Sequence, residues 1–445
     1  MITALLALLL RNSHKTGTPE LPKVGESIFC TAVWLALFAL LLGAQDDFQT
    51  QFAKGLKALH DRNFAAAQAG LQAASQLHPS DPHVWVALAD TYWKLGNAER
   101  AAEAAGKAQK LGAGDSITCR SLAIFYSDQG NLEKAGDIEA GCALANVPDP
   151  SAGIRAMRDY LQAGQFKKAI ALALALSEWE RRADIRNLLG KAYEANGQSA
   201  KAIQELQQAV RLKPEEEAYR FDLIELLLRH YDFSGAIQQS EAALKKFPKS
   251  AQLSLAAGVA YYGLDRADPA IAKFLQTIAL DPSVEQPYLF LSRVMNRARA
   301  SLPVITQRFA EYQATNPQSY LGYFLYAKAL NGQFKEPEHA ESLLRKSIAL
   351  NAEYWESHYE LAILLEKRGA LEEAEKEFRR TTELNPKEPS PHYRSCRVLA
   401  KLGRKKEAQA EAAVLQKVTE EYREDLSRRL ATVERLAIRD TDGPK

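Results

Sequence analysis

Most of this chain follows one repeating pattern of hydrophobic and polar positions. Between about residues 48 and 417, apolar side chains fall at helical spacing on short segments that polar turns separate. Alanine recurs there in steps of 34 residues, with one step of 33 and one gap of 70 residues between Ala270 and Ala340, where Val304 fills the expected place. The alanines of this series are Ala67, Ala101, Ala135, Ala169, Ala202, Ala236, Ala270, Ala340, Ala374 and Ala408. A fixed period of this length predicts an array of stacked supersecondary units.

Glycine and proline keep the same period at fixed offsets from the alanines. Glycine takes the left-handed conformation that ends one helix before the next begins, and proline stops the second helix. Alanine suits a place where two helices approach closely. Each unit is therefore predicted to be a helix, a short turn, a second helix and a proline-marked exit. The two series are Gly96, Gly130, Gly164, Gly197, Gly369 and Gly403, and Pro79, Pro214, Pro248, Pro282, Pro317 and Pro386.

These positions resemble the pattern of the tetratricopeptide repeat family, over about residues 48 to 417. The segment 184–214 matches well, with its large–small pair, aromatic residue, two alanines and final proline at Leu189-Gly190, Tyr193, Ala202, Ala209 and Pro214. The match weakens between about residues 285 and 353, where the spacing gains one or two residues twice. The resemblance implies an all-α fold, a right-handed superhelical solenoid of about eleven helical hairpins with a C-terminal capping helix.

The two ends of the chain fall outside this pattern. Residues 28–42 read IFCTAVWLALFALLL without a charge, and small residues follow up to Ala44. We expect residues 1–44 to be a cleaved signal peptide or an N-terminal membrane anchor through residues 28–44, with a buried helix as a third reading. At the other end, residues 418–445 are predicted to form a capping helix and tail. The charged segment Gln416–Ile438 suits a solvating cap or a helix that binds a partner.

Composition narrows the range of functions. The 57 Lys and Arg residues nearly balance 55 Asp and Glu residues, which argues against a nucleic-acid partner. No phosphate-binding loop, HExxH sequence or nucleophile elbow is present, and the repeats leave too few residues for a catalytic domain. We therefore predict no enzyme activity, no cofactor and no metal site.

The four cysteines include one pair of interest. Cys119 and Cys142 lie on the two predicted helices of one hairpin, near facing positions. They are either a disulfide, as an exported protein permits, or two buried thiols.

The family resemblance also implies where a partner binds. In this family the first helices of successive hairpins line a concave groove, through positions two, five, nine, twelve and thirteen of each repeat. Aromatic residues and arginine dominate these positions here, which is the combination enriched at interface hot spots. The candidate partner-binding residues are Trp93, Arg120, Arg158, Lys191, Phe221, Tyr262, Arg293, Arg297, Phe324, Lys328, Tyr359, Tyr393 and Arg397.

The sequence thus predicts a scaffold that binds a partner protein or an extended peptide segment in its groove. An exported location follows from the N-terminal segment: the periplasm, or attachment to the membrane facing outside the cytoplasm. The alternative is a module that binds a polyanion or glycan in envelope polymer export, against which the near-zero net charge weighs. The Lys-Asn, Asn and Lys-Arg set by which some members of the family hold acidic chaperone tails is absent.

Overall fold

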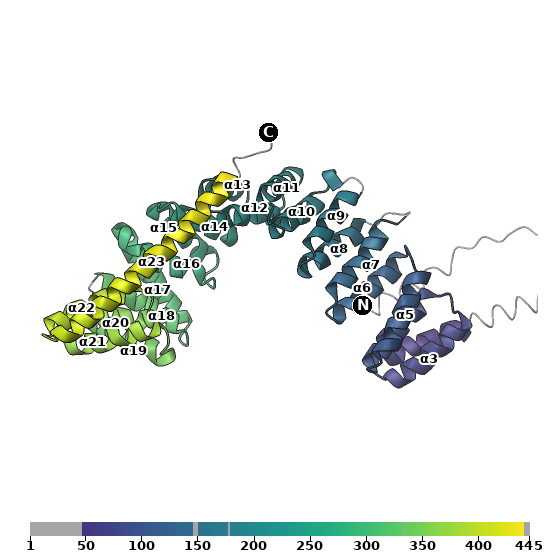
Figure 1. Cartoon of the computed structure of the whole chain (residues 1–445), viewed down its shortest axis with the longest axis horizontal. Helices are drawn as coiled ribbons and strands as arrows, with labels where there is room; N and C mark the ends of the chain where they lie inside the picture. The colour runs from purple at the N-terminus through teal and green to yellow at the C-terminus, as the bar shows by residue number, and fades with distance from the viewer. Residues whose placement is uncertain (1–46, 146–149, 177–178, 334, 440–445) are drawn as a thin grey trace, which may run out of the picture. The chain divides into compact units, whose positions relative to one another are not determined.

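The structure is a computed structural model that describes residues 47–439, apart from 146–149, 177–178 and 334, with side chains as far as residue 424. Regular structure in this part of the chain is entirely helical, without a strand. Successive helices pack against one another as helical hairpins (Figure 1). The predicted all-α solenoid is therefore confirmed. The predicted signal peptide or anchor, residues 1–44, lies outside the described residues.

The chain divides into two compact units, Met1–Glu205 and Leu206–Lys445, which we call unit 1 and unit 2. Unit 1 begins with a helix at residues 47–60, and three of its first helices, at residues 82–94, 116–128 and 150–162, each pack on the second helix that follows. Its further helices are α3 (Phe64–Leu77), α4 (Pro82–Lys94), α5 (Ala98–Leu111), α6 (Ser116–Asp128), α7 (Leu132–Ala143), α8 (Pro150–Gln162), α9 (Phe166–Ala175), η1 (Trp179–Arg181) and α10 (Ala183–Ala195). Helix α11 (Ser199–Leu212) crosses the division between the units.

Unit 2 continues the same alternation, and its first helices α16, α18 and α20 also contact one another in turn. Its helices are α12 (Glu217–Arg229), α13 (Phe233–Lys246), α14 (Ala251–Gly263), α15 (Ala267–Leu280), α16 (Gln286–Val294), η2 (Met295–Arg297), η3 (Arg299–Ser301), α17 (Leu302–Thr315), α18 (Tyr320–Gln333), α19 (Pro337–Leu350), α20 (Trp355–Arg368), α21 (Leu371–Leu384), α22 (Pro389–Lys401) and α23 (Lys405–Arg439).

The turn inside each hairpin follows from local chemistry. Gly96 ends α4 with a φ of 77°, in the left-handed region that suits glycine. The next residue, Asn97, caps α5 by accepting a hydrogen bond from the backbone N–H of Arg100 at 3.1 Å. The glycine–asparagine pair thus stops one helix and starts the next within two residues.

The alanine series marks the tight helix contacts, as predicted, with one correction. From Ala67 to Ala374, nine alanines of the series are at most 1% exposed. Val304 does not fill the vacant place, because its side chain is 47% exposed and Ile305 is fully buried instead. The two short turns η2 and η3 precede α17 and shift its register by one residue.

A second recurring contact ties several of the hairpins to the turn before them. The side chain at position four of a repeat donates a hydrogen bond to the backbone carbonyl six residues earlier, at 2.8 to 3.1 Å. Trp, Arg, Tyr and His all make this bond, so position four accepts different residue types whose long side chains carry a hydrogen-bond donor. The pairs include Trp85 with Pro79, Arg220 with Pro214, Tyr288 with Pro282, Tyr323 with Pro317 and His392 with Pro386.

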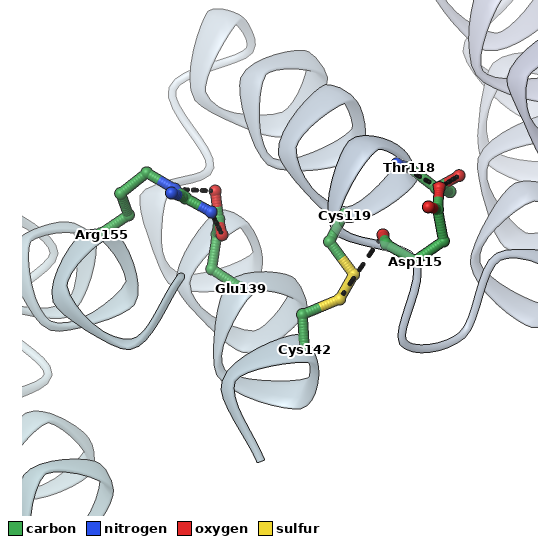
Figure 2. Close-up of a disulfide and its surroundings, with 6 residues drawn as sticks. All are labelled: Asp115, Thr118, Cys119, Glu139, Cys142 and Arg155. Atoms are coloured by element: carbon green, nitrogen blue, oxygen red, sulfur yellow. Dashed lines mark hydrogen bonds and ion pairs between the residues drawn. A yellow bond between two sulfur atoms is a disulfide. The ribbon is translucent and has the colours of Figure 1, made fainter. Parts of the chain in front are cut away.

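Unit 1 contains a covalent link within one hairpin. Cys119 on α6 and Cys142 on α7 form a disulfide, with their Cα atoms 6.5 Å apart (Figure 2). This Cα separation lies in the range that a disulfide requires. Of the two alternatives for these cysteines, the structure therefore has the disulfide.

The C-terminal end is one long helix. Helix α23 runs through residues 417 and 418 without a break, so the expected capping helix is an extension of the last hairpin's second helix (Figure 1). Although α23 has 35 residues, neither it nor another described helix is both long and apolar enough to cross a membrane.

Candidate partner-binding surface

The predicted partner-binding residues all come from first helices or, for Arg297, from the turn η2 that follows one. We call the surface they form the first-helix face of each unit. Eight of them are exposed and four are half-buried, so a partner can reach them. The exposed ones are Trp93, Arg120, Arg158, Lys191, Arg293, Arg297, Tyr393 and Arg397, and the half-buried ones are Phe221, Tyr262, Lys328 and Tyr359.

Phe324 is the exception, and its prediction as a partner-contacting residue is corrected. Its side chain is 1% exposed. The ring of Tyr354, from the turn before α20, lies 5.1 Å from the Phe324 ring, and the Lys328 ammonium lies 5.3 Å from it. The register was right, because Tyr323 before it makes the position-four hydrogen bond. The next hairpin simply covers the side chain.

The weakly matching region of the sequence keeps its predicted orientation. Met295 is 1% exposed, whereas Arg293, a predicted partner-binding residue, is exposed. The Arg293 guanidinium lies 6.0 Å from the ring of Phe290, and Arg297 pairs with Asp265 from the preceding hairpin. The two arginines therefore remain on the surface, although α16 is short.

In unit 2 the structure brings several first-helix side chains into one polar cluster. Its centre is Glu366 on α20, which is 8% exposed. Three cations of α22, the first helix of the last hairpin, surround it: Arg394 Nη1 at 3.1 Å, Arg397 Nη2 at 2.5 Å and Lys401 Nζ at 3.0 Å. Burial alone raises the pKa of the Glu366 carboxyl, but the bonds from Lys401 and Arg397 outweigh it and hold the pKa below its usual value. Glu366 is therefore ionised at neutral pH.

A second buried carboxyl lies one helical turn and a half earlier on α20. Burial raises the pKa of Glu360, against the opposing charge of Lys328 at 3.9 Å. Asn331 on α18 donates to its Oε2 atom at 3.1 Å, and Lys367 Nζ donates to the Asn331 carbonyl at 2.9 Å. These bonds tie α18 to α20 on the first-helix face of unit 2.

Beside the Glu366 cluster lies an open pocket of about 480 Å³. We call it the α20–α23 pocket, since it is lined by Tyr359 of α20, by Pro389, Ser390, Tyr393 and Arg394 of α22, and by Leu415 and Thr419 of α23. Arg394 Nε donates to the Tyr359 phenol oxygen at 3.2 Å, which leaves the phenol proton of Tyr359 to be donated elsewhere. The Tyr393 side chain is 54% exposed at the pocket's edge.

The first-helix face of unit 1 contains neighbouring carboxyl groups. Burial raises the pKa of Asp90 on α4, Lys94 opposes this, and the neighbouring carboxylate Asp128 adds to it. Trp93, on the same helix, is 38% exposed. This face therefore combines an exposed aromatic ring with carboxyl groups that repel one another.

Sequence reasoning missed the central members of the α20–α23 pocket and the Glu366 cluster. Arg394 occupies position six of its repeat, which the family rule does not count as a groove position. Its role depends on Tyr359 and Glu366, which lie in the preceding repeat. The available signal was charge complementarity between neighbouring repeats, at separations of 28 to 36 residues along the chain.

The arrangement suits the binding of a polar segment. Among the described side chains, no three His, Cys, Asp or Glu residues are grouped so that they could hold a metal ion. The pocket supplies an aromatic edge, hydroxyl groups and a guanidinium, which are groups that hold a polar segment in place.

Comparison with known proteins decides the family. Two sequence profiles described as tetratricopeptide repeat match this chain, one at residues 58–123 and the other at 155–217, 221–285 and 333–389, together more than half of its length. The chain belongs to the tetratricopeptide repeat family. Tetratricopeptide repeats build protein-interaction scaffolds, which are generally non-enzymatic, and the matches support a protein-interaction scaffold here.

Solved tetratricopeptide structures resemble the chain only loosely. Yeast Tom70 is 16% identical, with a TM-score of 0.36, over 90% of this chain and 100% of that one. The C-terminal part of a repeat protein from Cytophaga hutchinsonii is 17% identical, with a TM-score of 0.40, over 60% and 96%. YrrB, described as having an unusual peptide-binding site, is 22% identical, with a TM-score of 0.33, over 42% and 96%. No curated protein matches the sequence.

Proposed function

We propose that the protein is an exported scaffold that binds an extended segment of a partner protein along the first-helix face of unit 2. The α20–α23 pocket carries this proposal. In this pocket the exposed ring of Tyr393, the guanidinium of Arg394 and the phenol proton of Tyr359 lie together on the first helices α20 and α22. Aromatic and arginine side chains on a rigid support are typical of interface hot spots.

The exported location rests on two features. The uncharged segment at residues 28–42 has the form of a signal sequence or a membrane anchor. The Cys119–Cys142 disulfide is of a kind that persists outside the reducing cytoplasm. Thiol labelling of the denatured protein from intact cells tests this: Cys119 and Cys142 should label only after reduction, whereas Cys396 labels without it. Labelling of all three before reduction contradicts export.

Site-specific photo-crosslinking tests the binding surface. A photoreactive amino acid at Tyr393 should give one dominant adduct with a partner protein in cell-envelope extract. Tyr231 is the matched control, because its side chain has the same 54% exposure but lies in the turn after α12. The proposal predicts an adduct from position 393 and none from position 231. Equal yields at the two positions, or no adduct at 393, would rule out this face.

A further inference from the structure

The Glu366 cluster has more positive than negative charge. Arg394, Arg397 and Lys401 share one carboxylate, and the guanidinium of Arg397 and the ammonium of Lys401 are each about half exposed. Of the other carboxylates near the α20–α23 pocket, Glu360 is paired with Lys328 at 3.9 Å, and Glu388 accepts a hydrogen bond from the Ser390 hydroxyl at 2.9 Å. Even with Glu388 counted, the three cations exceed the two carboxylates.

The same hairpins contain a second ion cluster, in which the numbers of positive and negative charges are equal. On the second helices, Glu375 is 4% exposed and contacts Arg379 at 2.6 Å and Arg404 at 3.3 Å. Glu407 completes this cluster, at 2.5 Å from Arg404 and 3.9 Å from Arg379. Two cations thus meet two carboxylates. The Glu375 cluster is complete by itself, whereas the Glu366 cluster lacks a negative group.

The α20–α23 pocket shows what chemistry would supply that group. Arg394 uses Nε for Tyr359 and Nη1 for Glu366, so its Nη2 group remains a donor. The phenol proton of Tyr359 has no acceptor among the described residues. Both donors suit a carboxylate oxygen, while Pro389 and Leu415 form an apolar wall beside them.

We propose that the α20–α23 pocket binds a carboxylate side chain of the partner segment, flanked by an apolar side chain. The carboxylate contacts Arg394 and Tyr359, and the surplus charge of Arg397 and Lys401 attracts it. This inference rests on the proposed function and names the chemistry of the partner. The pocket differs from the chaperone-tail site, whose residue set the sequence lacks. Its donors come from the last two hairpins, and α23 lines one of its sides.

Two fluorescent octapeptides test the inference with the full-length protein. One alternates Glu with Leu and the other alternates Gln with Leu; we call them the Glu probe and the Gln probe. Because charge-assisted hydrogen bonds to arginine are about twice as strong as neutral ones, the Glu probe should bind at least about tenfold more tightly. Its affinity should fall as salt rises.

Paired variants locate the binding site. Arg397→Gln with Lys401→Gln should weaken Glu-probe binding about tenfold, and Tyr359→Phe should weaken it about threefold by removing one donor. Arg379→Gln with Arg404→Gln also removes two positive charges, but from the balanced Glu375 cluster, and should change binding of the Glu probe by less than about twofold. Circular dichroism confirms that each variant remains folded. Equal binding of the two probes, or an equal loss in both double variants, would overturn the inference.

A further arm separates peptide from polymer. Dextran sulfate should displace the Glu probe only weakly, because it has no apolar side chain for the Pro389–Leu415 wall. Tight binding of dextran sulfate that depends on Arg397 and Lys401 but not on Tyr359 would replace the peptide reading with a polyanion reading. If Tyr393 crosslinks a partner but the Glu probe does not bind, only the carboxylate inference fails. If neither occurs, the proposed function fails as well.

Discussion

Two buried carboxylates in this protein, one in each unit, are paired in different ways. In unit 1, Glu139 on α7 is 1% exposed and meets a single cation, Arg155 on α8, whose Nε and Nη2 atoms reach its two oxygens at 2.7 and 2.6 Å (Figure 2). In unit 2, Glu366 is 8% exposed and meets three cations, each about a third to a half exposed. In the first pair one arginine contacts both carboxylate oxygens, whereas the cations of the second cluster are partly exposed to solvent.

The difference separates a structural ion pair from a binding surface. A bidentate arginine satisfies both oxygens of the carboxylate and fixes the helices that carry the two residues. Cations that share one carboxylate keep unused donors and unneutralised charge, and they lie where a partner can approach. Burial of the carboxylate alone does not distinguish the two cases; the number and exposure of its cations does.

The largest effect should come from the bidentate Glu139–Arg155 pair. Glu139→Ala leaves the partly buried Arg155 without its bidentate partner and should lower the free energy of unfolding of unit 1 by about 3 kcal/mol or more. Hydrogen exchange of the amides in α7 and α8 measures this loss within unit 1. A loss below about 1 kcal/mol would show that this pair is no more structural than a surface pair.

The disulfide should come next, also in unit 1. Cys119 and Cys142 are 23 residues apart, and closing a loop of this length contributes about 3 kcal/mol by restricting the unfolded chain. Cys119→Ala with Cys142→Ala should therefore lower the unfolding midpoint of unit 1, as should a reductant acting on the unchanged protein. Cys396→Ala serves as the control in unit 2. If the reductant destabilises the double variant just as much, its effect does not act through the disulfide.

In unit 2, Glu366→Gln should cost less, about 1 to 2 kcal/mol, because its cations are partly exposed and regain water. The folded-state pKa of Glu366 is below its usual value, near 4.5, so its contribution is present above pH 4.5 and is lost as the pH falls through the folded pKa. The variant should therefore differ from the unchanged protein at pH 7 and converge with it in acid. A difference that is the same at all pH values would contradict an ionic role.

The smallest effect should come from Asp90, which has the opposite sign. Burial raises its folded-state pKa above the usual 3.8, so ionised Asp90 destabilises the fold at pH 7 and the penalty disappears as the pH falls below 3.8. Asp90→Asn should raise the stability of unit 1 at pH 7 by a few tenths of a kcal/mol, since the group is partly solvated. Thermal unfolding at pH 7 and in acid measures this, and destabilisation at pH 7 would show that Asp90 has a favourable partner.

Patterns within a single repeat predicted much of the architecture. The 34-residue period, the Gly96-Asn97 turn and the alanine contacts all depend on local backbone chemistry, and the structure has them. Val304 was misplaced because a single residue of extra turn changes which side of a helix is buried. The irregular spacing between about residues 285 and 353 does not show where the extra residue, here in the turns η2 and η3, is inserted.

The candidate site was predictable only in part. Tyr359, Tyr393 and Arg397 could be located because positions five and nine of a first helix line the groove in the family that the sequence resembles. Phe324 shares position five with the two tyrosines, yet Tyr354 from the next repeat covers it. Whether a side chain at a given position is exposed therefore depends on its neighbour as well as on the repeat itself.

The sequence by itself determined the helical hairpin, its turns and the family, because each depends on spacings within about 34 residues that any copy of the repeat must satisfy. Only the tertiary structure decided which side chains meet across repeats. Glu366 acquired three cations, Arg394 acquired Tyr359, and Cys119 paired with Cys142 because helix packing set their distances and orientations. These contacts depend on side-chain lengths in two elements at once, and a one-dimensional pattern does not encode that geometry.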